Sequence, residues 1–231
     1  MTMAEGAGAE VVVAEPRDEQ RDAILTELTA ELGDGLVGSH IRVGDDLWIR
    51  VRRAAWVDTF RMLRDKHRLR YFNFLSAIDW LPSPFGRDME AEVDTIVHGK
   101  MAKDPEPMVS GYAGGDTRFQ MLARVHNVVD HWGLTVKCDV PDDDVVMPTL
   151  IHVYAGASWH EREAHEMYGI AFEGHPDLRN LYLPTEFEGH PLRKDFPLLA
   201  RRIKPWPGIV DVEQMPGDDE PEAEPEAGDA G

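Results

Sequence analysis

Apolar side chains recur at helical spacing in two segments of the first third of the chain. In residues 17–32 the repeating apolar positions are Ile24, Leu28 and Leu32. In residues 54–67 they are Trp56, Phe60 and Leu63. Positions three and four apart lie on one face of a helix, so each segment predicts a helix with one buried face. Gly33 directly follows the first stripe and suits a helix end.

Apolar and β-branched runs bounded by turn residues predict several strands. The runs "IRV" and "LWIRV" flank Gly44-Asp45-Asp46 and indicate a hairpin. The run "YFNFLSAIDWL" predicts a strand, and "EAEVDTIVHG" is a weaker candidate to pair with it. "RFQMLARVHN" and "LTVKCDV" predict two further strands, after a long loop or a hairpin tip in residues 99–117. Helices before and after these strands indicate an α+β fold, with a mixed or antiparallel sheet and flanking helices.

The chain changes character at residue 169. Prolines follow at positions 176, 184, 191, 197, 205 and 207, and sustained apolar runs are few. Residues 169–208 are therefore predicted to form an extended C-terminal arm that lies on another surface. Residues 209–231 are acidic and low in complexity and are predicted to be disordered, while residues 1–16 are predicted to be mobile. The α+β domain is then predicted to span residues 17–168.

Charge and composition disfavour several classes of protein. The 231 residues carry a formal net charge of −19, which repels phosphates, so nucleic-acid binding is disfavoured. Cys138 is the only cysteine, so the chain cannot form an internal disulfide or supply the thiolates of an iron–sulfur cluster. No apolar run approaches the roughly 20 residues that span a bilayer. The start "MTMAEGAGAE" lacks the pattern of a signal peptide. We expect a cytosolic chain, or one that reaches a membrane only through partners.

The densest charged segment is "SWHEREAHEMYGI". Ser158 and Glu161 have the spacing of a capping box, in which their side chains bond to free main-chain amides at a helix start. Gly169 suits the other end, which predicts a helix of about ten residues. The positions predicted to be buried on it are Ala164, Met167 and Tyr168.

The charged side chains of this helix allow a metal site or a solvated face. His160 and His165 stand five apart, about 140° round a helix, whereas the zinc-protease motif needs histidines four apart. Glu161 and His165 stand four apart, a spacing at which both could bind one metal ion. A helix cap at Glu161 and a His165 side chain that faces solvent or a partner are favoured instead. Arg162 and Glu166 are predicted to form a solvated network; against a partner, the arginine would instead orient the contact.

The tetrapeptide Glu-Gly-His-Pro occurs twice, at residues 173–176 and 188–191. Glycine permits unusual backbone angles, and proline pushes the preceding histidine toward an extended conformation, so each copy predicts a stiff corner. A duplicated ligand loop, a two-histidine metal clamp and two corners of a docking segment all fit the repeat. A third metal ligand is not obvious at close spacing, although Asp177 and Asp195 lie nearby in the sequence.

The segment "EREAHEMYGIAFEGHPDLRNLY" resembles the signature of the C subunit of proton-translocating NADH:quinone oxidoreductase, respiratory complex I. The family includes the mitochondrial counterpart. "GHPLRKDFPL", residues 189–198, resembles its second block, and weaker similarity covers residues 20–200. Glu166 stands where the family more often has aspartate, and His165 where it usually has an aromatic residue. The acidic tail lies outside the pattern.

The resemblance implies a subunit with no catalytic residue, metal or cofactor of its own. FMN and iron–sulfur clusters would belong to partner subunits, at the cytoplasmic face of the bacterial cell membrane. The C-terminal arm would dock on the quinone-site subunit, which is the D subunit of the complex, with the B subunit as a neighbour. The residues expected to contact partners or to brace the arm are Glu161, Arg162, Glu163, His175, Arg179, His190, Arg193, Lys194 and Asp195.

Three other functions are compatible with the same residues. Membrane-bound hydrogenases and other quinone- or ferredoxin-linked complexes carry a similar subunit, and the electron donor binds elsewhere in them. An independent metal-dependent hydrolase would use Glu161, His165 and one histidine of the repeat. A stand-alone adaptor with an acidic tail is the weakest alternative, because it gives the predicted C-terminal arm no role.

Overall fold

The computed structural model describes residues 18–82 and 107–196 of the chain. Residues 1–16, the predicted strand "EAEVDTIVHG" and residues 209–231 lie outside the described residues. The elements are α1 (Glu19–Leu32), β1 (Leu36–Arg42), β2 (Asp46–Val51), α2 (Trp56–Asp65), β3 (Tyr71–Asp79), β4 (Phe119–Asn127), β5 (Trp132–Val140), β6 (Val146–Pro148), α4 (Ala157–Tyr168) and β7 (Ala171–Glu173). Short 3-10 turns precede β1 and α2, at Gly33–Gly35 and Arg53–Ala55.

The main sheet has five strands in the order β1-β2-β5-β4-β3. The pair β2–β5 is parallel, and the other neighbours are antiparallel, so the sheet is mixed. The predicted α+β fold is thereby confirmed. A second, parallel pair joins β6 to β7 and was not predicted, because each strand has only three residues and β6 contains Pro148.

Local sequence signals account for α1 and for the hairpin of β1 and β2. The main-chain N–H of Arg21 donates to Asp18 Oδ1 over 3.1 Å, which caps the start of α1. The predicted hairpin is confirmed as β1 and β2. Gly44 in its turn has φ of 73°, a left-handed conformation that glycine adopts without strain.

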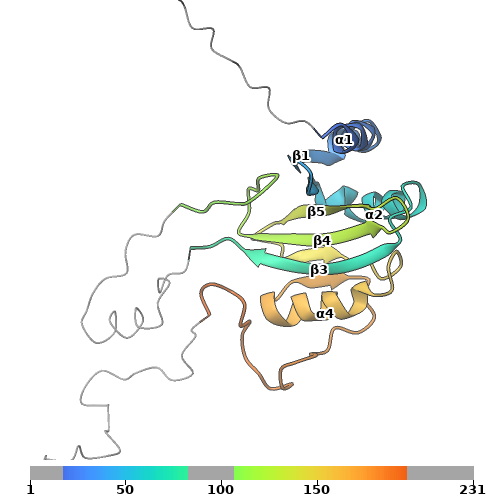
Figure 1. Cartoon of the computed structure of the whole chain (residues 1–231). Coiled ribbons are helices and arrows are strands. Elements are labelled where there is room, and N and C mark those ends of the chain that lie inside the picture. Colours follow the sequence, from blue (N-terminus) through green and yellow to red (C-terminus); the bar gives the residue numbers. More distant parts are fainter. Residues whose placement is uncertain (1–17, 83–106, 197–231) are drawn as a thin grey trace, which may run out of the picture.

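The hydrophobic core lies between one face of the sheet and the helices. Alternate strand residues point to one face, and those that face the core include Leu47 and Ile49 of β2. The predicted stripe of α2 is confirmed, since Trp56, Phe60 and Leu63 are all fully buried. Figure 1 shows α4 running beneath β3. The sheet thus provides a rigid platform for α4 and for the segment that follows it.

The loop of residues 107–117 lies on the opposite face of the sheet. The sequence predicted a loop or hairpin tip for residues 99–117, of which residues 99–106 lie outside the described residues. The Tyr112 ring lies 5.6 Å from the Trp48 ring of β2, centroid to centroid. Lys137 of β5 donates from Nζ to the carbonyl oxygen of Tyr112 over 2.8 Å. These contacts fix the loop across the sheet, on the side away from the core.

Candidate functional site

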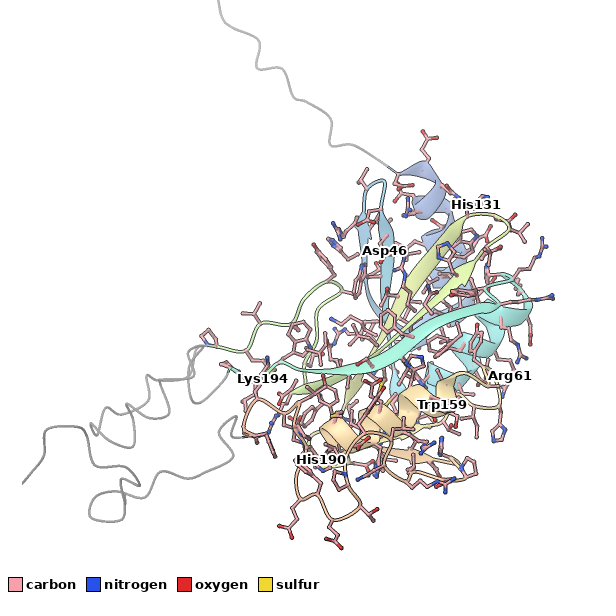
Figure 2. All side chains as sticks on the ribbon, turned by 60° about the horizontal axis from the view of Figure 1, so that its bottom comes forward. Asp46, Arg61, His131, Trp159, His190 and Lys194 are labelled. Atoms are coloured by element: carbon pink, nitrogen blue, oxygen red, sulfur yellow. The ribbon has the colours of Figure 1, made fainter. Side chains whose placement is uncertain are left out.

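The candidate site is α4 together with the described part of the C-terminal arm, residues 169–196. Its first residues belong to the folded domain, because β7 pairs with β6 and Ile170 and Phe172 are buried in the core. From residue 174 onward the arm has no helix or strand in its described part. In Figure 2 this segment passes along α4, with His190 near one end of the helix.

Glu166 of α4 binds the main chain of the C-terminal arm. Its side chain is buried, and its carboxylate accepts hydrogen bonds from the N–H groups of Leu181, Tyr182 and Leu183. Burial disfavours the charged form, but the three N–H donors outweigh burial and hold the pKa of Glu166 below its ordinary value. One helix side chain therefore fixes the path of three consecutive arm residues.

Arg162 holds the preceding turn of the arm. Its guanidinium donates from Nε to the carbonyl oxygen of Arg179 over 2.9 Å and from Nη2 to that of Asn180 over 3.2 Å. The predicted solvated network of Arg162 and Glu166 is wrong, because both side chains bind arm backbone instead of one another. The helix side chains thus pair with main-chain groups of the arm that have no partner in a helix or strand.

Glu161 faces the other way, into the domain. It is fully buried and accepts from Thr149 Oγ1 over 2.5 Å and from the N–H of Leu150 over 2.6 Å. Burial raises its pKa to about 7, although both hydrogen bonds favour the carboxylate. The predicted capping box is wrong: α4 begins at Ala157, after Gly156, without a side-chain cap. Glu161 instead ties α4 to the residues that follow β6.

Two further predictions for α4 concern its end and its buried face. Gly169 has φ of 75° and donates its N–H to the carbonyl oxygen of His165, so the predicted helix end is confirmed. Ala164 is buried as predicted, whereas Met167 and Tyr168 are only partly buried. The helix has 12 residues, slightly longer than predicted.

The two Glu-Gly-His-Pro corners have different contacts. Gly174 and Gly189 have φ of 85° and 96°, which confirms the predicted unusual backbone. Nε2 of His175 lies 3.2 Å from Ser158 Oγ, at the start of α4. Nδ1 of His190 donates to the carbonyl oxygen of Glu166 over 2.8 Å, near the end of α4. The repeat therefore brackets one helix, with a histidine near each end.

The last described residues bind the sheet through an ionic latch. Arg118 pairs with Asp79, whose side chain is fully buried, and lies 2.8 Å from Asp195 of the arm. The N–H of Lys194 donates to Asp79 Oδ2 over 2.8 Å. Arg193 donates from Nε to the carbonyl oxygen of Tyr168 over 2.6 Å. Arg118 and Asp79 were not predicted, because their link to the arm joins residues far apart in the sequence.

Other predicted site residues lie nearer the surface. Arg179 pairs with Asp177 at 2.9 Å, and 78% of its side chain is exposed. Glu163 is partly buried and makes no hydrogen bond with another described residue. Sequence reasoning missed two aromatic side chains here, Trp159 of α4 and Tyr182 of the arm, which are 67% and 65% exposed. Large exposed aromatics beside a structured segment are a feature of protein-binding surfaces.

The histidines of α4 have structural contacts. The His160 ring packs edge-on against Phe72 at 5.6 Å, and His165 Nδ1 donates to the carbonyl oxygen of Ile170 over 2.9 Å. Residues 18–82 and 107–196 contain no group of three or more His, Cys, Asp or Glu residues that could hold a metal ion. Within the same ranges, no helix is both long and apolar enough to cross a membrane.

Comparison with known proteins identifies the family of this chain. Residues 49–202 match the family described as respiratory-chain NADH dehydrogenase, 30 Kd subunit. The NADH-quinone oxidoreductase C subunit of Burkholderia multivorans is 32% identical over 178 residues, which cover 77% of this chain and 76% of that protein. The C subunit of Roseiflexus castenholzii is 33% identical over 180 residues, covering 78% of this chain and 86% of that protein.

A solved structure shares the fold. A chain of the membrane-bound sulfane sulfur reductase, an archaeal respiratory membrane complex, aligns with a TM-score of 0.54 at 20% identity. The alignment covers 78% of this chain and 88% of that chain. The sequence match and the α4 signature agree, and the chain belongs to the family of the 30 Kd subunit of respiratory-chain NADH dehydrogenase, the C subunit of NADH-quinone oxidoreductase.

Proposed function

We propose that this chain is a non-catalytic subunit in the peripheral arm of a proton-translocating NADH:quinone oxidoreductase. It docks on the quinone-site subunit, next to the B subunit, at the cytoplasmic face of the membrane. FMN, the iron–sulfur clusters and the quinone belong to other subunits. Family membership and the geometry of α4 and the C-terminal arm support this assignment.

The observation that carries the proposal is the immobilised arm. Arg162 and Glu166 hold its backbone, and the latch at Asp195 fixes its last described residues. A segment without secondary structure that is held in one conformation loses less entropy when it binds a partner. The charged side chains of α4 thus shape a docking surface. The role of the chain in the complex is to position its partner subunit.

The exposed groups on this surface suit a protein partner. Trp159 and Tyr182 present aromatic rings to solvent, and Arg179 presents a guanidinium. Tryptophan, tyrosine and arginine are the residue types that most often dominate the energy of protein interfaces. Arg162 lies 5.9 Å from the centroid of the Trp159 ring, which joins the exposed aromatic group to the residue that holds the arm.

Two truncations test the docking role. Because Ile170 and Phe172 belong to the core, the deletion must start after β7. Removal of residues 177–231 deletes the groups bound by Arg162, Glu166 and Arg118, whereas removal of residues 209–231 deletes only the acidic tail. We expect the first variant to lose co-purification with the quinone-site subunit from detergent-solubilised membranes, and the second to retain it.

Folding is measured separately, by circular dichroism and thermal unfolding of each purified variant. The core side chains of α2 and the sheet remain in both truncations, so both should show cooperative unfolding. Co-purification of the 177–231 deletion at the full yield would show that the arm does not carry the docking.

A second candidate function is the equivalent subunit of a related membrane-bound complex. This second function is supported by the fold that the chain shares with a chain of the archaeal sulfane sulfur reductase complex. The electron donor binds elsewhere in either assembly, so the partners distinguish the two. A pull-down of the tagged chain should recover subunits that bind FMN and oxidise NADH; recovery of a hydrogenase-type assembly without NADH oxidation would establish the second function.

A further inference from the structure

A cavity of about 570 Å³ lies on the sheet face opposite the core. The loop of residues 107–117 forms one side of it, and the strands form its floor. Aromatic and aliphatic side chains dominate its lining and include Trp48, Ile78, Trp80, Tyr112 and Leu122. Its volume is in the range of about 300–1,000 Å³ that is typical of small-molecule sites. None of the functional roles proposed above uses this cavity.

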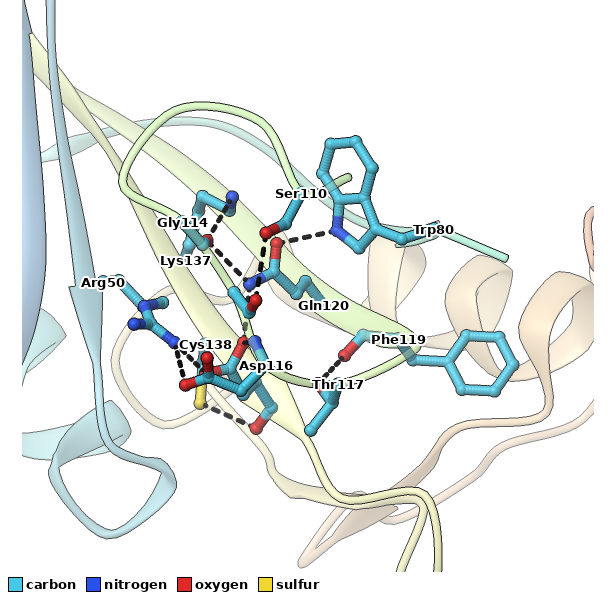
Figure 3. Close-up of polar contacts among 12 residues, drawn as sticks. Arg50, Trp80, Ser110, Gly114, Asp116, Thr117, Phe119, Gln120, Lys137 and Cys138 are labelled. Atoms are coloured by element: carbon cyan, nitrogen blue, oxygen red, sulfur yellow. Dashed lines mark hydrogen bonds and ion pairs between the residues drawn. The ribbon is translucent and has the colours of Figure 1, made fainter. Parts of the chain in front are cut away.

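Besides His40, whose ring stacks on the Tyr112 ring at 4.4 Å between centroids, the basic side chain of the lining is Lys137. It is 1% exposed, and its ammonium donates to the carbonyl oxygens of Tyr112 and Gly114 over 2.8 and 2.9 Å. Figure 3 shows Lys137 beneath the loop at Gly114. The Trp80 ring lies 5.2 Å from Nζ. An ammonium has three N–H donors, and the third has no acceptor among the described residues.

The neighbouring acidic groups are already engaged. Arg50 pairs with Asp116 at 2.7 Å and with Asp139 at 2.5 Å. Burial lowers the pKa of Lys137 to about 8; Asp139 opposes this effect and Arg50 adds to it. Among the described residues, Lys137 therefore lacks a carboxylate partner of its own. A buried ammonium without a counter-ion is an unfavourable arrangement that a bound anion would improve.

We propose that this cavity binds a molecule with an apolar body and a carboxylate that pairs with Lys137. The aromatic walls would take the apolar body, and the third N–H of the ammonium would take a carboxylate oxygen. Trp48 belongs to the same lining, and its Nε1 is buried without an acceptor among the described residues. Two sources share this chemistry: a small aromatic or fatty acid, and the C-terminus of a peptide with an apolar last residue.

Calorimetric titration of the full chain with phenylbutyrate and with phenylbutanol tests the proposal. The two probes share the apolar body and differ in the charged group. We expect the acid to bind at least about tenfold more tightly, since hydrogen bonds between charged groups are the stronger kind. Equal affinity of the two probes, or no binding of either, would overturn the proposal.

Variants separate the two parts of the site. Lys137→Met should weaken binding of the acid by about tenfold or more and leave the alcohol unchanged. Lys66→Met, at an exposed lysine outside the cavity, is the matched control and should change neither. Leu122→Phe fills the cavity and should weaken both probes. If Lys137→Met binds the acid as tightly as the wild type does, the ammonium does not pair with the carboxylate.

Two further measurements complete the test. If Lys137→Met unfolds, the wild-type affinity is followed as the pH rises through the lysine pKa of about 8. Acid binding should weaken as the ammonium loses its proton, and alcohol binding should stay constant; a constant acid affinity would overturn the proposal.

Peptides that end in phenylalanine, with free or amidated C-termini, distinguish the two sources of the carboxylate. Tighter binding of the free peptide than of phenylbutyrate would identify a chain terminus, and the reverse a small acid.

Discussion

At the scale of single residues, the pKa values of two buried glutamates of α4 are shifted in opposite directions. Glu161 and Glu166 are both buried, and both accept main-chain N–H groups. Burial raises the pKa of Glu161 to about 7, whereas for Glu166 the main-chain donors outweigh burial and lower the pKa. Glu166 has donors from three consecutive residues, and Glu161 has one main-chain donor and one hydroxyl. Burial is therefore the larger effect on the pKa of Glu161, whereas the three main-chain donors together with the Arg162 charge are the larger effect on the pKa of Glu166.

The variant Glu161→Gln should change how stability depends on pH. The folded-state pKa of Glu161 is raised from 4.5 to about 7, so its stabilising contribution is complete below pH 4.5 and is lost as the pH rises to about 7. Glutamine stays neutral throughout. The free energy of unfolding of the wild type, relative to the variant, should fall across this window by roughly 1.4 kcal/mol per unit of pKa shift. Urea denaturation at several pH values measures it; a pH-independent difference would contradict it.

At the scale of elements, α4 acts as a template for the C-terminal arm. The helix contacts the arm at both histidine corners and at the segment between them. Close approach at the helix end also requires glycine, because a Cβ on Gly169 would lie 2.5 Å from His190 and Arg193 atoms. The Arg118 latch then fixes the end of the described arm to Asp79, at the end of β3, and to Arg118, the residue before β4. The arm conformation therefore depends on side chains of other elements.

Glu166→Gln tests this dependence. The amide keeps the shape but loses the charge that three N–H donors stabilise, so the arm should bind α4 more weakly by about 1.5–3 kcal/mol. We expect faster hydrogen exchange at the amides of residues 181–183, with little change in the core strands. Glu163→Gln, on the same helix without a hydrogen bond to another described residue, is the matched control.

The pH dependence gives a second check on Glu166. Its pKa is lowered from 4.5, so its contribution is present above pH 4.5 and is lost as the pH falls through the lower folded-state value. Exchange at the same amides, corrected for the intrinsic rate, should therefore accelerate at acidic pH. Unchanged protection in Glu166→Gln at neutral pH would show that the carboxylate does not hold the arm.

At the scale of the whole molecule, the two faces of the sheet have different exposed features. The core side carries α4, the C-terminal arm and the exposed rings of Trp159 and Tyr182. The other side carries the loop of residues 107–117 and the cavity that contains Lys137. The sheet separates the two, so a partner on the arm and a ligand in the cavity can bind without sharing residues.

Replacement of both exposed rings, in Trp159→Ala with Tyr182→Ala, should weaken assembly without weakening the fold. Both side chains are mostly solvated in the isolated chain, so the free energy of unfolding should change by less than about 0.5 kcal/mol per site. Truncation of interface hot spots costs about 2 kcal/mol or more, so co-purification with the quinone-site subunit should fall sharply. Val129→Ala, at a 68% exposed turn residue, is the control. Full assembly of the double variant would exclude these rings as contacts.

How well the sequence predicted a feature depended on how far apart in the chain its interacting residues lie. Trp56, Phe60 and Leu63 lie within two turns of one helix, and their spacing alone identified a buried face. The pair β6–β7 joins segments of three residues, too short to show a period. Glu161 had the correct spacing for a cap, yet Thr149 and Leu150 provide its partners. Local patterns were reliable where the competing contacts were also local.

The sequence by itself determined the α+β class, the helices and strands with clear periodicity, and the glycines at Gly169, Gly174 and Gly189 that need left-handed backbone. It also determined the family, because the α4 signature is contiguous. Only the tertiary structure decided what the charged residues of that signature do. Arg162, Glu161 and Glu166 bind groups 11 to 18 positions away, and the path of the chain decides which groups those are. Spacing along a helix fixes the direction of a side chain, but not its hydrogen-bond partner.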